Sequence, residues 1–113
     1  MTDVKIEIER TMRNMGMSGT KKGFWCFYWS VVFALENPMV LYTVSRDLYP
    51  LVAEACNMSK ANVERDMRSL VEWCWDYGDR EAMRAISGRK LVVRPSVGEL
   101  VDYVAAYLRY QGF

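Results

Sequence analysis

The chain has 113 residues, of which 51% are hydrophobic and 26% charged, with only three prolines, so its composition is that of one packed globular domain. The 15 basic and 14 acidic residues nearly cancel, which excludes a strong overall positive field as a means of attracting nucleic acid. The chain contains no histidine, and this removes the commonest general base and the usual zinc and iron ligands.

No segment has the length or position of a membrane anchor or a secretion signal. The longest apolar run covers residues 24 to 35, whereas a membrane-spanning helix needs about 20 apolar residues. The N-terminus is charged rather than apolar. The cysteines Cys26, Cys56 and Cys74 have no metal-binding or redox spacing and are expected to be reduced. We therefore expect a cytoplasmic protein without membrane contact, metal or cofactor.

Helical periodicity dominates the chain, and the predicted fold is an all-α bundle of about six helices in a single domain, residues 1–113. The first helix covers residues 4 to 15 and ends at Gly16. A basic turn over residues 18 to 23 then leads to an aromatic helix over 24 to 36. Asn37 and Pro38 form a cap and a first helical residue, and Pro50 starts a helix over 50–56 in the same way.

The most informative stretch is an amphipathic helix predicted over residues 59–77. Ser59 is a suitable N-cap, and Gly78 ends the helix. At about 100° per residue, the apolar positions fall in one narrow stripe that predicts the buried face, whereas Arg65 points away from it. The stripe consists of Val63, Met67, Leu70, Val71 and Cys74.

The remaining chain contains two further helices and a connector. A short helix is predicted over residues 79 to 87, and a basic connector with a brief β-like run follows over 88 to 94. Ser96 and Glu99 have the spacing of a capping box, so the last helix runs from there to about Tyr110. Its inward residues are Leu100, Val101, Val104, Ala105 and Leu108.

The helices over 50–56 and 59–77, joined by a tight turn, have the form of a helix-turn-helix. The second helix exposes its N-terminal half, which is the end that a recognition helix inserts into the major groove. There an arginine pairs with a guanine edge, a glutamate accepts from a cytosine amino group, and residues at the helix start hold phosphates. From spacing alone, a helical hairpin with a solvated charged face explains the pattern equally well, because residues 57 to 78 carry three cations and four carboxylates.

Several short motifs carry a resemblance to a known family. They are Lys22-Gly23-Phe24, Leu48-Tyr49-Pro50 with Val52-Ala53, Val63-Glu64-Arg65 with Arg68, Trp75, Gly78, and Arg94-Pro95-Ser96 with Glu99. Over about residues 5 to 110, the chain resembles the C-terminal effector domain of the sporulation initiation factor, the stage-zero response regulator of endospore-forming bacteria. The resemblance implies a six-helix fold that binds double-stranded DNA and controls transcription, with RNA polymerase as a further partner.

Carried over residue by residue, the resemblance implies two groups of DNA contacts. The base-reading residues are expected to be Glu64, Arg65 and Arg68. The phosphate-holding start of the helix matches Ser59, Lys60 and Asn62. On charge rather than on motif, the connector is expected to add backbone contacts from Arg89, Lys90 and Arg94.

The chain departs from the family pattern in ways that bear on DNA binding and its control. A phospho-acceptor receiver domain usually precedes this domain, and Met1 leaves no room for one, so phosphorylation in cis is not expected to switch the chain. Asn62 stands where the family tends to carry arginine, and Asp66 where it carries a small residue. Both changes reduce the positive charge beside the DNA groove and are expected to alter sequence preference or weaken binding.

The helix over residues 24 to 36 is a third departure, because it is apolar on both of its faces. Such a helix is either enclosed in the core or lies at an interface. One face carries Trp25, Tyr28 and Trp29, at positions that are more polar in the family. We expect this face to dock a second copy of the chain or another protein, unless a larger core encloses the rings.

The sequence thus predicts a sequence-specific DNA-binding transcriptional regulator that reads the major groove with the helix over 59–77. The alternative is a non-catalytic protein-interaction module that retains the fold but not the DNA affinity, and that modulates another regulator. The near-neutral charge and Asp66 favour this module, whereas Arg65 at the centre of the exposed face favours DNA. An enzyme is not expected, because no phosphate-binding loop, carboxylate constellation or nucleophile–base pair emerges.

Overall fold

The structure, a computed structural model, describes residues 3–113 and is all-α, as predicted. No strand forms in this part of the chain, and none of its helices is long and apolar enough to cross a membrane. The six α-helices are α1 (Val4–Asn14), α2 (Phe24–Glu36), α3 (Tyr49–Cys56), α4 (Lys60–Tyr77), α5 (Arg80–Ser87) and α6 (Val97–Tyr110). Two short helical turns, η1 (Pro38–Leu41) and η2 (Val44–Leu48), connect α2 to α3.

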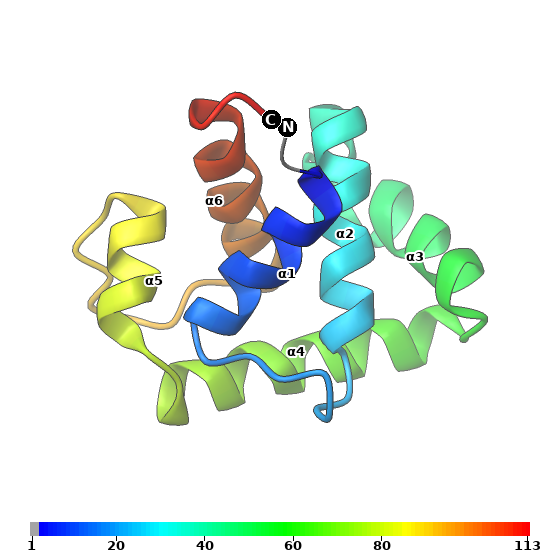
Figure 1. Ribbon diagram of the computed structural model, residues 1–113. Coiled ribbons are helices and arrows are strands. Elements are labelled where there is room, and N and C mark those ends of the chain that lie inside the picture. Colours follow the sequence, from blue (N-terminus) through cyan, green and yellow to red (C-terminus); the bar gives the residue numbers. More distant parts are fainter. Residues whose placement is uncertain (1–2) are drawn as a thin grey trace.

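The longest helix, α4, lies across one end of the molecule, below the other helices in Figure 1. Above it, α1, α2 and α6 pack against one another, while α3 contacts both α2 and α4. At the other end of α4, α5 packs against α6. Val4 and Phe113 line one pocket, so the two ends of the chain meet on the side of the molecule away from α4. One long face of α4 is therefore left uncovered.

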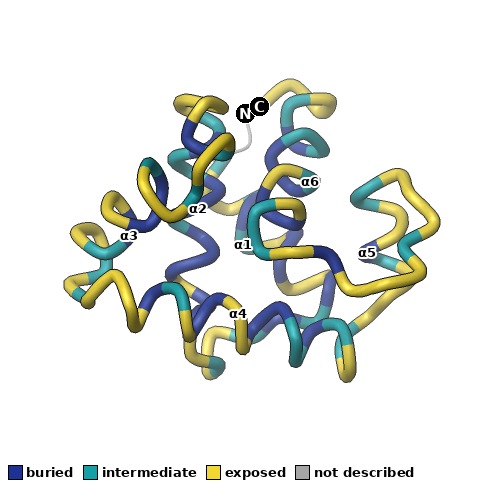
Figure 2. Tube along the Cα trace, turned by 180° about the vertical axis from the view of Figure 1, so that it is seen from behind, coloured by how far each residue is buried: buried dark blue, intermediate teal, exposed yellow. Residues whose placement is uncertain are grey.

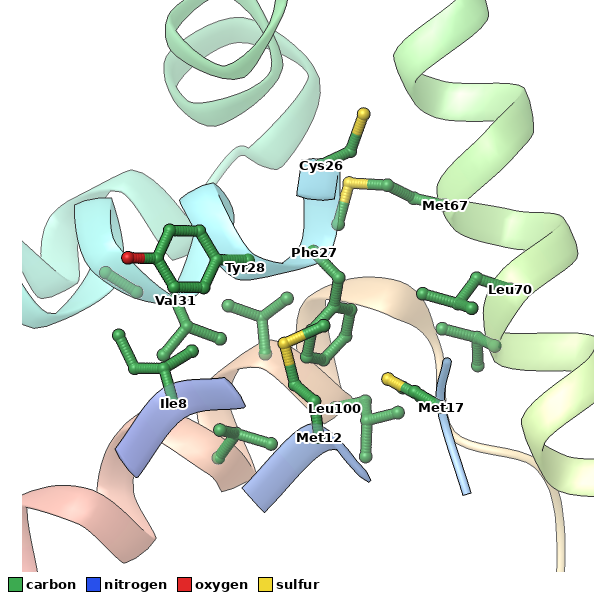
Figure 3. Packing of buried hydrophobic residues seen from close by; sticks show 14 of the residues in the cluster. Ile8, Met12, Met17, Cys26, Phe27, Tyr28, Val31, Met67, Leu70 and Leu100 are labelled. Atoms are coloured by element: carbon green, nitrogen blue, oxygen red, sulfur yellow. The ribbon is translucent and has the colours of Figure 1, made fainter. Parts of the chain in front are cut away.

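The core is built around α2, which contacts α1, α3, α4 and α6. Figure 3 shows the ring of Phe27 surrounded by Met12 and Met17 from the N-terminal part, Leu70 of α4 and Leu100 of α6. All five apolar positions predicted for the inner stripe of α4 are buried, and so are the five predicted for α6. Figure 2 shows the buried positions of α4 on the side that faces the other helices. The amphipathic pattern thus fixes which face of α4 remains available to a ligand.

The predicted helix boundaries in the second half of the chain are confirmed by their caps. The Oγ of Ser59 accepts a hydrogen bond from the Asn62 N–H at 3.1 Å and starts α4. At the start of α6, the Glu99 N–H donates to the Ser96 Oγ at 3.1 Å, and the Ser96 N–H donates to the Glu99 carboxylate at 3.0 Å. In this reciprocal capping box, the backbone hydrogen bond from Ser96 is the main cause that lowers the pKa of Glu99 below its usual value.

The connections between helices differ from the predictions in detail. After the Asn37 cap, Pro38 starts only the single 3₁₀ turn η1, and the π-type turn η2 then runs directly into α3. As a result, α3 begins at Tyr49, one residue before the predicted start. The β-like run in the connector before α6 forms no strand, and its Val92 and Val93 side chains are exposed. A strand needs a partner, and no neighbouring extended segment supplies one within residues 3–113.

The segment between α1 and α2 packs main chain against main chain onto α4. The Asp79 N–H, just beyond α4, donates to the Met15 carbonyl at 2.9 Å. A Cβ atom at Gly16 would lie 2.8 Å from the Gly78 Cα, and a Cβ at Gly23 would lie 2.8 Å from the Asp66 carbonyl carbon. Side chains have no room at these approaches, so the glycines hold the segment over residues 15–23 directly on the α4 backbone.

Candidate nucleic-acid interface

The exposed face of α4 is positioned by a short turn from α3. Only residues 57 to 59 separate the two helices. Asn57 adopts the predicted left-handed conformation with a φ of 52°, and the Met58 N–H donates back to the Ala53 carbonyl at 2.9 Å. Ser59 then caps α4, so its first N–H groups and the positive end of its dipole lie beside the turn. Two packed helices joined in this way have the connection of a helix-turn-helix.

The side chains predicted to read bases lie together on the uncovered face of α4. The Arg65 side chain is 63% exposed, and its Nε donates to the Asp66 carboxylate at 3.2 Å. The Arg68 side chain is 59% exposed and donates to Glu64 at 3.1 Å. The Arg68–Glu64 pair is exposed at both ends, and pairs of this kind contribute at most about 1 kcal/mol. The Arg68 guanidinium is therefore able to exchange its partner for a ligand at little cost, whereas the exposed Arg65 guanidinium is bonded to a carboxylate that is only 11% exposed.

The phosphate-holding residues predicted at the start of α4 are also accessible. Ser59, Lys60 and Asn62 are all exposed and occupy the first turn of the helix or its cap. Their positions match the end of a helix where N–H groups and the dipole favour an anion. The structure thus brings these three residues and the base-reading group onto one continuous surface.

Asp66 lies inward and not at the edge of the exposed face, where the helical angle alone placed it. Its side chain is only 11% exposed, and it lines a cleft together with Lys21 and Lys22. The loop before α2 packs over this position of α4, and that packing covers the carboxylate. The first half of α4 then presents three cations and one partly exposed carboxylate, Glu64. The Asp66 carboxylate therefore repels an anionic ligand at this face less than its position in the sequence suggested.

Two lysines that the sequence analysis did not assign to this surface lie beside it. Lys21 and Lys22 belong to the loop before α2, which Gly23 anchors on the α4 backbone. The Lys21 Nζ lies 4.2 Å from the ring centroid of Trp73 on α4, and Lys22 is exposed. The sequence itself shows that these two adjacent lysines lie in a polar turn. Their proximity to α4 depends on a tertiary contact that the sequence pattern does not reveal.

The basic residues of the connector before α6 lie in two different regions of the fold. Arg94 returns to α4, where its Nη1 lies 3.8 Å from the Glu72 carboxylate and where it lines a groove with Arg68. Residues 89 and 90 follow α5, which leads away from the C-terminal end of α4 (Figure 1). The Arg89 guanidinium lies 5.4 Å from the Tyr103 ring centroid on α6. The structure therefore brings Arg94 to the α4 surface and leaves Arg89 and Lys90 apart from it.

The aromatic face of α2 is smaller than the sequence suggested. The Tyr28 residue is only 6% exposed, because α1 packs across this part of α2, and Figure 3 places its ring near Ile8. Its ring packs edge-on against Trp25 and Trp29, with centroid distances of 5.4 Å to each. Trp29 is half-buried, whereas Trp25 is 46% exposed. Of the three residues expected to dock a partner, Tyr28 is thus enclosed, and Trp25 is the one that presents a large surface.

These features define an all-α domain in which a three-residue turn presents the cationic first half of a long helix, the connection found in helix-turn-helix domains. The match of the chain to the family described as Sporulation initiation factor Spo0A C terminal covers residues 8–108. The chain belongs to this family, whose members are DNA-binding effector domains of sporulation response regulators and are not catalytic. The resemblance drawn from the sequence motifs is thereby confirmed.

Proposed function

We propose that this chain is a sequence-specific DNA-binding transcriptional regulator that inserts the N-terminal half of α4 into the major groove. The observation that carries the proposal is Arg65, which projects from the centre of the uncovered face of α4 with its side chain 63% exposed. Glu64 and Arg68 lie next to it and supply an acceptor for cytosine and a second donor for guanine. Family membership supports double-stranded DNA as the ligand.

Cations on both sides of α4 support contacts to the DNA backbone. At about 100° per residue, Arg65 lies between the side of α4 that faces Lys21 and Lys22 and the side that faces Arg94. Lys60 adds a cation at the start of the helix. A duplex centred on Arg65 therefore meets positive charge along both of its strands. Such phosphate contacts fix the register of the protein and supply most of the salt dependence of binding.

The test is a selection of bound sequences from random duplexes at two salt concentrations, followed by affinity measurements on two variants. Arg65→Ala is expected to cost about 1–3 kcal/mol on the selected site and to relax base preference at one position. Lys60→Ala is expected to weaken binding to all sequences and to reduce the salt slope by about one. If both variants bind the selected and the random duplexes as the unchanged chain does, α4 is not the DNA-reading element.

A second candidate is a protein-interaction module that retains the fold without DNA affinity. The observations that favour it are the intramolecular ion pairs of Arg65 and Arg68 and the exposed ring of Trp25. In this case α2 docks a second copy of the chain or another regulator, and RNA polymerase is a further proposed partner. Light scattering of the purified chain, with Trp25→Ser as the variant, tests the homodimer. Selection that yields no enriched duplex even at low salt supports the module over the DNA reader.

A further inference from the structure

Three sulfur-containing side chains meet in the cleft between α2 and the turn that precedes α4. The Sγ of Cys26 lies 3.6 Å from the Sδ of Met58. Cys56 is the last residue of α3 and lies two residues before Met58 in the chain. All three residues line the same solvent-open cleft, and Figure 3 shows the Cys26 thiol directed out of the core cluster, away from Phe27. The cluster is therefore formed by α2 and by the segment over residues 56–58, and it is reachable from solvent.

The chemistry of these side chains points to a soft metal ion. Among residues 3–113, no three His, Cys, Asp or Glu side chains gather in a way that could hold a metal, so Zn²⁺ lacks its usual ligand set. Two thiols and a thioether are instead the soft ligands that select Cu(I) over harder divalent ions.

We propose that Cys26, Cys56 and Met58 form a three-coordinate binding site for Cu(I). On binding, each of the two thiols releases its proton to solvent, two thiolate–copper bonds and one thioether–copper bond form, and the copper keeps its oxidation state. The filled site then carries one negative charge. Lys21 and Lys22 line the same cleft and offset both that charge and the charge of Asp66, which also lines it.

The distance between the Cys26 and Met58 sulfurs suits such a site. Metal–sulfur bonds in proteins are about 2.3 Å long, so three sulfurs in a plane around one ion lie about 4 Å apart. The Cys26 and Met58 sulfurs are already 3.6 Å apart, which requires only a small outward shift. Met58 is half-buried, and an unbranched methionine side chain has the rotational freedom to make that shift. A side-chain shift alone thus brings the Cys26 and Met58 sulfurs to metal-bound spacing, and Cys56 lines the same cleft.

The experiment is an anaerobic titration of the full chain with Cu(I), buffered by a competing chromophoric chelator, together with X-ray absorption of the loaded protein. We expect one copper per chain with three sulfur neighbours at about 2.3 Å. Cys56→Ser removes a thiolate and is expected to weaken binding by more than about 100-fold, beyond the range for outer-shell partners. Met58→Leu is expected to weaken binding by about 10-fold and to leave two sulfur neighbours.

Cys74→Ser is the matched control, because Cys74 is also a free cysteine but lies on α4 with its thiol bonded to the Met15 carbonyl at 3.2 Å. It is expected to bind copper as the unchanged chain does, and circular dichroism verifies that each variant remains helical. Absence of tight binding to the unchanged chain overturns the proposal. So does full binding by Cys56→Ser, or two-sulfur coordination that Met58→Leu leaves unaltered.

Discussion

The contact of Gly23 with α4 allows a direct test of how the lysine-bearing loop is held beside the proposed DNA-reading helix. Gly23 precedes α2 with a φ of 88°, in the left-handed region. Its Cα faces the main chain of Asp66, and an added methyl group would lie 2.8 Å from the Asp66 carbonyl carbon and closer still to its oxygen. Gly23→Ala therefore meets both a conformational and a steric obstacle.

The two costs are separable and add. An alanine in the left-handed conformation costs roughly 1–2 kcal/mol. A methyl group forced into a packed site typically costs about 1–3 kcal/mol more, because the obstacle is backbone of α4 and not the end of a flexible side chain. Gly23→Ala is therefore expected to lower the free energy of unfolding by about 2–5 kcal/mol.

The assay is urea unfolding followed by tryptophan fluorescence, with Gly88→Ala as the matched control. Gly88 also has a positive φ, 69°, but a Cβ there would meet nothing within 4 Å. Its substitution is expected to cost only the conformational part, about 1–2 kcal/mol. Equal losses of stability for the two variants would refute the close contact between Gly23 and the α4 backbone.

Four further substitutions test the surface and the cap. Lys22→Ala is expected to reduce the salt slope of DNA binding by about one, whereas Arg89→Ala, at the far end of α5, is expected to leave the slope unchanged. Fluorescence anisotropy titrations with DNA at several salt concentrations measure both slopes. Equal slopes for the two variants would contradict the placement of Lys22 beside the DNA. Asn62→Arg adds a cation at the start of α4 and is expected to strengthen binding to every duplex and steepen the slope by about one, so an unchanged slope would place this position outside the interface. The pKa of Glu99 is lowered in the folded chain, so its charge stabilises at pH values above its unfolded pKa, and the contribution is lost as the pH falls through the folded pKa. Glu99→Gln is expected to lower stability by about 0.3–1 kcal/mol at neutral pH and by less in acid, and a pH-independent difference in urea unfolding would contradict this.

The helices and the inner face of α4 could be predicted from the sequence because they depend on local signals. Ser59 and Ser96 begin helices through hydrogen bonds to residues three positions later, and Asn57 ends a helix by its own left-handed conformation. The spacing of apolar residues fixes the buried stripe in the same local way. The segment over residues 37 to 48 was less predictable, because its 3₁₀ and π turns follow from how the chain must reach α3.

The surroundings of α4 could not be predicted, because they depend on which distant segments pack against it. A helical angle places Asp66 at an edge, but the loop before α2 covers it. The same loop brings Lys21 and Lys22 to α4, although they are distant in sequence. Charge alone could not separate Arg94, which returns to α4, from Arg89, which lies over α6. Local pattern thus predicted the exposed residues of α4 better than the segments that flank them.

The contact of the α1–α2 connection with α4 acts largely through main-chain atoms. The Met15 carbonyl, Gly16 and Gly23 meet backbone of Asp79, Gly78 and Asp66, while Lys21 adds a side-chain contact to the Trp73 ring. These main-chain contacts do not use the Arg65 and Arg68 side chains, so substitutions there leave them in place. If the proposed role of α4 holds, its preferred DNA sequence can therefore change one side chain at a time while the scaffold stays the same.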